Sequence, residues 1–165
     1  MARVDKKKKL RPSLLDRLID NEPHSQSEID QGHHQLLRQM RDSVRRDLET
    51  LLNTRYHIIA PPEEYAELEK SLLNYGLPDL ATVNIIDKKR RDEFTTRLET
   101  TLSDFEPRFK SVRVSYVDNK DSTDRTLRFR IDAEIYADPL PETVVFDSIL
   151  ESVTRTVSVK EISHG

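Results

Sequence analysis

The spacing of apolar residues changes at one proline, and this change constrains the fold more than any other feature of the chain. Before Pro107, apolar residues such as Phe94, Leu98 and Leu102 recur every three or four positions, which is typical of an amphipathic helix. After it, residues 112–117 carry apolar side chains at every second position, as in a half-buried strand. A proline disfavours helix in the residue before it, so the helix must end there. Helices first and strands second predict an α+β domain, with the helices packed on one face of a small antiparallel sheet.

A short amphipathic helix is predicted near the amino terminus, over residues 12–20. Its apolar stripe consists of Leu14, Leu15, Leu18 and Ile19. About two turns of helix are unstable alone in water, so this stripe must pack against something. Two alternatives remain open: the helix packs on its own domain, or a partner protein supplies the groove.

Three further helices follow from the same period. The best supported begins near Ile29 or Gly32 and runs to Asn53. A shorter helix is predicted over residues 63–74, and Gly76 after it is suited to the left-handed conformation that ends helices. The last helix begins near Asp87 and ends at the proline corner.

The carboxyl-terminal half is predicted to form strands. Residues 112–117 and 127–135 alternate in polarity and flank a polar loop over 118–124, which predicts an antiparallel hairpin. Two more strands are expected over residues 144–153 and 156–160. Such a sheet exposes an edge, which can accept an extended arm of another protein through backbone hydrogen bonds.

Length and charge divide the chain into three parts. Its 165 residues fit a single domain. Residues 1–11 carry a net charge of +5 within a chain of net charge -3, and are expected to form a basic, disordered arm. Residues 12–28 are expected to form the short helix and a linker, and residues 29–162 a single α+β domain. The basic arm is either a solvated tail or a site for nucleic acid or an acidic protein surface.

Composition excludes several kinds of chemistry. With no cysteine, the chain has no disulfide, thiolate metal site or cysteine nucleophile, and this fits the cytoplasm. Its three glycines form no phosphate-binding loop, and no apolar run is long enough to span a bilayer. No histidine pair has the spacing of a helical zinc site, and no serine or carboxylate pair can be assigned a catalytic role. We therefore expect no catalytic residue, no metal and no cofactor.

One charged cluster stands out at the helix-to-strand corner. Phe105, Glu106, Pro107, Arg108 and Phe109 place a carboxylate and a guanidinium beside a rigid proline, between two aromatic rings. The pair is suited to bidentate binding of a partner's charged side chains, at a small cost in entropy. The alternative is an internal salt bridge that closes the corner.

Four short motifs occur in an order that resembles a known family. They are residues 12–18 (Pro-Ser-Leu-Leu-Asp-Arg-Leu), residues 73–80 (Leu-Asn-Tyr-Gly-Leu-Pro-Asp-Leu), the Glu106-Pro107-Arg108 corner and residues 146–150 (Phe-Asp-Ser-Ile-Leu). Together they resemble the baseplate wedge and sheath-initiator family, which includes TssE of type VI secretion and the small wedge protein of contractile phage tails. The resemblance spans roughly residues 11–160.

This resemblance implies a structural, non-enzymatic subunit. It would be cytoplasmic, in a machine assembled at the inner membrane, and would contact the wedge proteins TssF and TssG, with other baseplate and spike components as possible neighbours. It would start the TssB–TssC sheath by edge-strand pairing. Glu106, Pro107 and Arg108 match the motif that anchors the family to the wedge, and Leu14, Leu15, Leu18 and Ile19 are a second expected contact.

Two alternative functions belong to other classes. The family is sometimes labelled lysozyme-like, so one alternative is a peptidoglycan hydrolase, although no catalytic pair can be carried over. The other is an adaptor whose basic arm binds nucleic acid, with a steep dependence on salt.

Overall fold

The structure is a computed structural model, and it describes a subset of the chain. The described residues are 14–18, 33–55, 64–65, 67–68, 71–77, 88–119, 126–137, 140–151, 154 and 156–162. The elements are α1 (Leu14–Leu18), α2 (His33–Asn53), the 3₁₀ turn η2 (Leu72–Asn74), α3 (Lys88–Phe105), β1 (Phe109–Val117), β2 (Leu127–Ile135), β3 (Glu142–Glu151) and β4 (Thr156–Glu161). This layout confirms the predicted α+β class. The basic arm, the linker after α1 and Ile19 lie outside the described residues.

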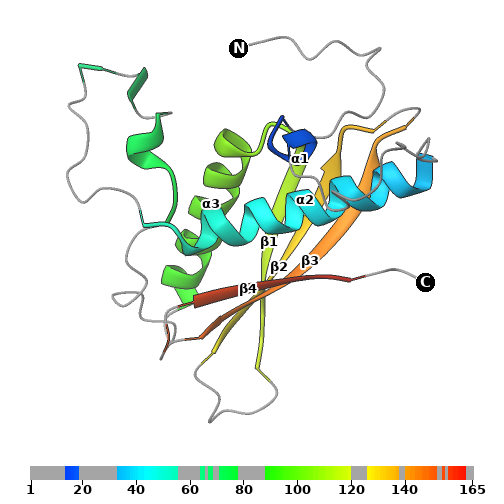
Figure 1. Cartoon of the computed structure of the whole chain (residues 1–165). Helices are drawn as coiled ribbons and strands as arrows, with labels where there is room; N and C mark the ends of the chain where they lie inside the picture. Colours follow the sequence, from blue (N-terminus) through cyan, green and yellow to red (C-terminus); the bar gives the residue numbers. More distant parts are fainter. Residues whose placement is uncertain are drawn as a thin grey trace.

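The four strands form one antiparallel sheet in the order β1-β2-β3-β4. Each strand therefore pairs with the next along the chain, and β1 and β4 are the edges. Figure 1 shows a twisted sheet, in which β4 runs at a large angle to β1. The predicted hairpin is confirmed, since β1 pairs with β2.

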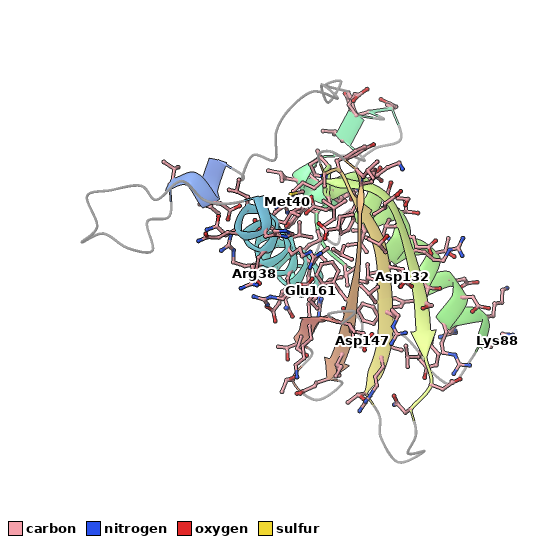
Figure 2. The ribbon with its side chains drawn as sticks, turned by 90° about the vertical axis from the view of Figure 1, so that its right-hand side faces the viewer. Arg38, Met40, Lys88, Asp132, Asp147 and Glu161 are labelled. Atoms are coloured by element: carbon pink, nitrogen blue, oxygen red, sulfur yellow. The ribbon has the colours of Figure 1, made fainter. Side chains whose placement is uncertain are left out.

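Both long helices lie on one face of the sheet. α3 packs mainly beside β1 and α2 runs along β4 (Figure 1). The sheet face toward the helices is apolar, and β2 shows this most clearly because its residues 127, 129, 131, 133 and 135 are all buried. Met40 of α2 packs against this core, whereas Arg38 on the same helix is exposed (Figure 2). The opposite sheet face is mostly polar, as expected for an antiparallel sheet covered on one side.

The segment before Gly76 differs from the prediction. Instead of one helix over residues 63–74, the described part contains only short 3₁₀ turns, the last being Leu72–Asn74. Ser71 interrupts the helix, because its backbone is extended (φ -90°, ψ 172°) and its hydroxyl accepts from the N–H of Leu73. Serine competes with helix in this way by bonding to the nearby backbone. The prediction of a continuous helix there was wrong.

Gly76 has the positive φ that the sequence predicted, at 113°. The turn places Leu77 against the end of α2, where its N–H donates to the carbonyl oxygen of Thr54 at 2.8 Å. A Cβ at position 76 would lie 2.4 Å from that same oxygen. Both the backbone conformation and the close approach therefore require glycine.

Replacing Gly76 with alanine should lower the free energy of unfolding by about 1–3 kcal/mol through the strained backbone alone, and the clash with Thr54 should add to this. Urea denaturation followed by circular dichroism measures the change. Stability equal to that of the wild type would contradict the geometry around Thr54.

Ser148 is a polar residue in the centre of the core, in β3. It is 1% exposed, and its hydroxyl has no hydrogen-bond partner among the described residues. Because a buried unsatisfied polar group is costly, Ser148→Ala should raise the free energy of unfolding by about 1 kcal/mol. The matched control is Ser158→Ala on the exposed face of β4, which should change stability little. Equal effects of the two substitutions, in thermal unfolding, would contradict this account.

Candidate functional site

Three consecutive residues, Glu106, Pro107 and Arg108, connect α3 to β1. α3 ends at Phe105, Pro107 occupies a turn, and β1 begins at Phe109. Two backbone bonds close the corner: Glu106 N–H donates to Leu102 O at 2.9 Å, and Phe109 N–H donates to Glu106 O at 3.1 Å. The charged pair is thus fixed to the junction of the two elements.

Glu106 is buried within the subunit, with 5% of the residue exposed. Its Oε1 accepts from the backbone N–H of Arg108 at 3.1 Å and from the Nε of Arg108 at 2.6 Å. Its Oε2 accepts from a terminal nitrogen of the same guanidinium. The carboxylate therefore has a bidentate partner two residues away, a strong form of charge-assisted hydrogen bond.

Arg108 also reaches across to α2. Its Nη2 donates to Asp47 Oδ2 at 2.6 Å and its Nη1 donates to Ser43 Oγ at 3.0 Å. Hydrogen bonds and charge from Glu106 and Asp47 raise the pKa of Arg108 above its ordinary value, although desolvation, the largest single effect, acts in the opposite direction. The guanidinium joins the corner to the middle of α2, and its side chain keeps 22% exposure.

The same cluster extends to α1. Ser43 Oγ donates to Asp16 Oδ2 at 2.6 Å, and Arg46 forms an ion pair with the same carboxylate. The hydroxyl of Ser43 thus accepts from Arg108 and donates to Asp16. We call Asp16, Ser43, Asp47, Glu106 and Arg108 the corner cluster. It ties α1, α2 and the helix-to-strand corner together.

Tyr75 lies beside this cluster. Its ring meets Phe105 edge to face, with ring centroids 5.4 Å apart. Burial raises the pKa of the Tyr75 hydroxyl, and the negative charges of Asp47 and Glu106 raise it further. The segment that ends at Gly76 therefore also packs at the corner.

The structure resolves the alternative that the sequence left open at the corner. Glu106 and Arg108 form an internal ion pair, and Glu106 is not turned outward toward solvent. The internal salt bridge is therefore formed, and Asp47 and Ser43 on α2 provide the guanidinium with further acceptors inside the fold. Whether the corner also meets a partner stays a prediction, and Pro107 is exposed there.

Sequence reasoning missed most of the corner cluster. Asp47 and Ser43 lie about 60 residues before Arg108, and nothing in their local pattern marked them as its partners. One signal was available: Ser43 and Asp47 are spaced i and i+4, so they lie on one face of α2.

Two leucine side chains of α1, those of Leu15 and Leu18, are exposed. Leu15 is 58% exposed and Leu18 is 82% exposed, while Asp16 on the same helix is held by α2. The side chain of Leu14 lies outside the described residues. α1 is therefore attached by its polar side. The described part of its predicted stripe stays uncovered within the described subunit.

Helix side chains reach the backbone at both edges of the sheet. On β4, Asn53 at the end of α2 donates to Val157 O at 2.9 Å and accepts from Val157 N–H at 2.8 Å. On β1, Glu99 of α3 accepts from Val114 N–H at 2.7 Å. Each edge strand thus has one residue with a backbone group on the open side of the strand that already bonds to a helix side chain.

The described residues show neither a metal cluster nor a membrane-spanning helix. Over those ranges, no group of three or more histidine, aspartate or glutamate side chains is placed to hold a metal ion. No described helix combines the length and apolar character needed to cross a bilayer.

Comparison with known proteins identifies a family. The family described as baseplate wedge protein gp25 matches residues 38–140, more than half of the chain. The match runs from α2 through the corner to the end of the β1–β2 hairpin, and so contains every residue of the corner cluster except Asp16. No curated protein matches the chain. The chain therefore belongs to the baseplate wedge protein gp25 family, and its role is that of a structural component of a baseplate.

Proposed function

We propose that this chain is the TssE-type subunit of a type VI secretion baseplate, which binds the wedge proteins TssF and TssG and starts the TssB–TssC sheath on the cytoplasmic side. The observation that carries the proposal is the family match over residues 38–140, which includes the Glu106-Pro107-Arg108 corner. The order of the four sequence motifs, which resembles that of this family, also supports it. Copurification with the type VI proteins tests it.

Wedge binding is assigned to the surface around α1 and the corner. Leu15 and Leu18 supply exposed apolar area, and Pro107 and part of the Arg108 guanidinium supply a rigid polar neighbour. Because Asp16 holds α1 to the helix that also binds Arg108, the two parts are linked through the corner cluster. Burial of exposed leucines against a partner groove is a common source of binding energy for short helices.

Sheath initiation is assigned to a sheet edge. An added strand would gain backbone hydrogen bonds, so the template would not depend on a particular side-chain pattern. Deleting Thr156–Lys160 is unsuitable as a test of this step. It would remove Val157 and Val159, which are 2% and 3% exposed and belong to the core.

A point substitution tests wedge binding without disturbing the core. Leu18→Asp should reduce copurification of TssF and TssG at least tenfold, because a carboxylate would be placed in an apolar contact. Leu72→Asp is the matched control, since Leu72 is 84% exposed and Leu18 is 82% exposed. The control should retain wedge binding, and both variants should retain the circular dichroism spectrum of the wild type.

Two results would contradict the proposal. If wild-type protein captures neither wedge nor sheath proteins, the type VI assignment fails. If Leu18→Asp and Leu72→Asp bind the wedge proteins equally well, α1 is not part of the contact.

A further inference from the structure

The two edge strands differ in how their backbones are blocked. In an antiparallel pair, the N–H and C=O groups of alternate residues point to opposite sides of the strand. On β4, Ile162 N–H donates to Val145 O of β3 at 2.9 Å. The backbone N–H and C=O groups of even-numbered residues therefore point toward β3, and those of odd-numbered residues point away from the sheet edge. Val157 is the first outward residue, and Asn53 binds both of its backbone groups.

Beyond Val157, the outward backbone groups of β4 have no hydrogen-bond partner within the described residues. Val159 and Glu161 lie on the same outward side as Val157, and within the described residues no hydrogen bond takes their backbone groups. Arg41 of α2 contacts Glu161, but through the side-chain carboxylate at 3.4 Å. Figure 2 shows this end of β4 beside α2. Asn53 therefore occupies the outward backbone groups only at the start of β4. The outward groups of Val159 and Glu161, which follow, remain next to each other along the edge.

The block on β1 has a different place and a different chemistry. Val114 is the central one of three outward residues, with Val112 before it and Tyr116 after it. The N–H of Val114 donates to the carboxylate of Glu99. A second α3 residue, Arg91, lies over the Tyr116 ring, with its guanidinium carbon 4.6 Å from the ring centroid. An added strand would meet a negative group in its middle, opposed to its own carbonyl oxygens. Charged groups of this kind are a known protection of sheet edges.

We propose that β4 is the edge that accepts an extended arm of a sheath subunit, that Asn53 fixes the register of that arm, and that Glu99 closes β1. A primary amide carries one donor group and one acceptor, as a strand residue does, so Asn53 occupies one strand position and the arm pairs from Val159 onward. A slip of one residue would move every side chain of the arm to the other face, so a fixed end determines the register. This inference rests on the proposed function for the identity of the arm.

The state of the isolated chain is tested first, by residue-resolved amide hydrogen exchange on the full-length protein. The amides of Val157 and Val114 should exchange slowly, and the outward amides of Val159 and Glu161 at least tenfold faster. Asn53→Ala should speed exchange at Val157 at least tenfold. Thr50→Ala is the matched control on the same helix, because the Thr50 hydroxyl bonds only within the helix, to Arg46 O. Unchanged exchange at Val157 in Asn53→Ala would overturn the blocking role of Asn53.

The arm is tested with the purified cognate TssB–TssC heterodimer. Binding should slow exchange at Val159 and Glu161 at least tenfold and leave Val112 and Tyr116 unchanged. Protection of the β1 residues, or of neither edge, would overturn the edge assignment while the proposed function stands. If the heterodimer does not bind at all, both the proposed function and the pairing of a sheath arm with β4 are overturned. The isolated-chain result for Asn53 and Glu99 would still hold. Protection of Val159 that rises with protein concentration alone would identify the occupant as a second copy and overturn the sheath arm.

Discussion

Replacing Arg108 with methionine should lower the free energy of unfolding by about 3–5 kcal/mol, because removing one partner of a buried ion pair leaves the other charge uncompensated. Glu106 is 5% exposed, and the guanidinium of Arg108 donates to both of its carboxylate oxygens. Methionine would keep only the backbone N–H bond from residue 108 to Oε1. The substitution keeps an apolar side chain of similar length and removes the guanidinium that also joins Asp47 and Ser43. Urea denaturation gives the change directly.

A double substitution separates charge from packing. Adding Glu106→Gln to Arg108→Met should restore part of the lost stability, because the amide carries no uncompensated charge. Glu106→Gln alone should cost less than Arg108→Met alone, since Arg108 keeps Asp47 at 2.6 Å and is more exposed than Glu106. An Arg108→Met protein with the stability of the wild type and no wedge binding would instead show that the guanidinium acts only on a partner.

The elements were predictable where a pattern within one segment determines the structure. α3 ends at Phe105 because Pro107 excludes helix in the residue before it, and β2 follows the alternation of residues 127–135. The end of α2 at Asn53 was also predicted. Each of these boundaries depends on residues that are neighbours in sequence.

The site was less predictable because it depends on contacts between distant segments. The sequence indicated a charged corner but could not choose between a partner and an internal bridge. That choice is decided by Asp47 and Ser43, which approach Arg108 only when α2 packs against the sheet. In the same way, no pattern around Asn53 indicates that its amide bonds to Val157, 104 residues later. Side-chain contacts to a backbone edge leave no periodic signal.

Phe146→Ala should lower the free energy of unfolding by about 3–5 kcal/mol, through lost apolar burial and the cavity that remains. Phe146 is fully buried and lies in β3 between Ile131 of β2 and Glu161 of β4. It begins the Phe-Asp-Ser-Ile-Leu motif, one of the four on which the family resemblance depends. The expected result is a large loss of stability, measured by urea denaturation, because this position is part of the core.

Asp147→Ala is the control in the same motif. Asp147 lies on the opposite sheet face with its side chain 44% exposed, and its ion pair with Arg130 at 2.9 Å is also open to solvent. Such an exposed pair contributes about 1 kcal/mol or less, so the alanine variant should stay close to wild-type stability. Similar losses from both substitutions would mean that the two faces of β3 are equally covered in the folded protein. A large difference would show that this motif contains a core position beside a surface position, so that only its alternate residues can contact a partner in the baseplate.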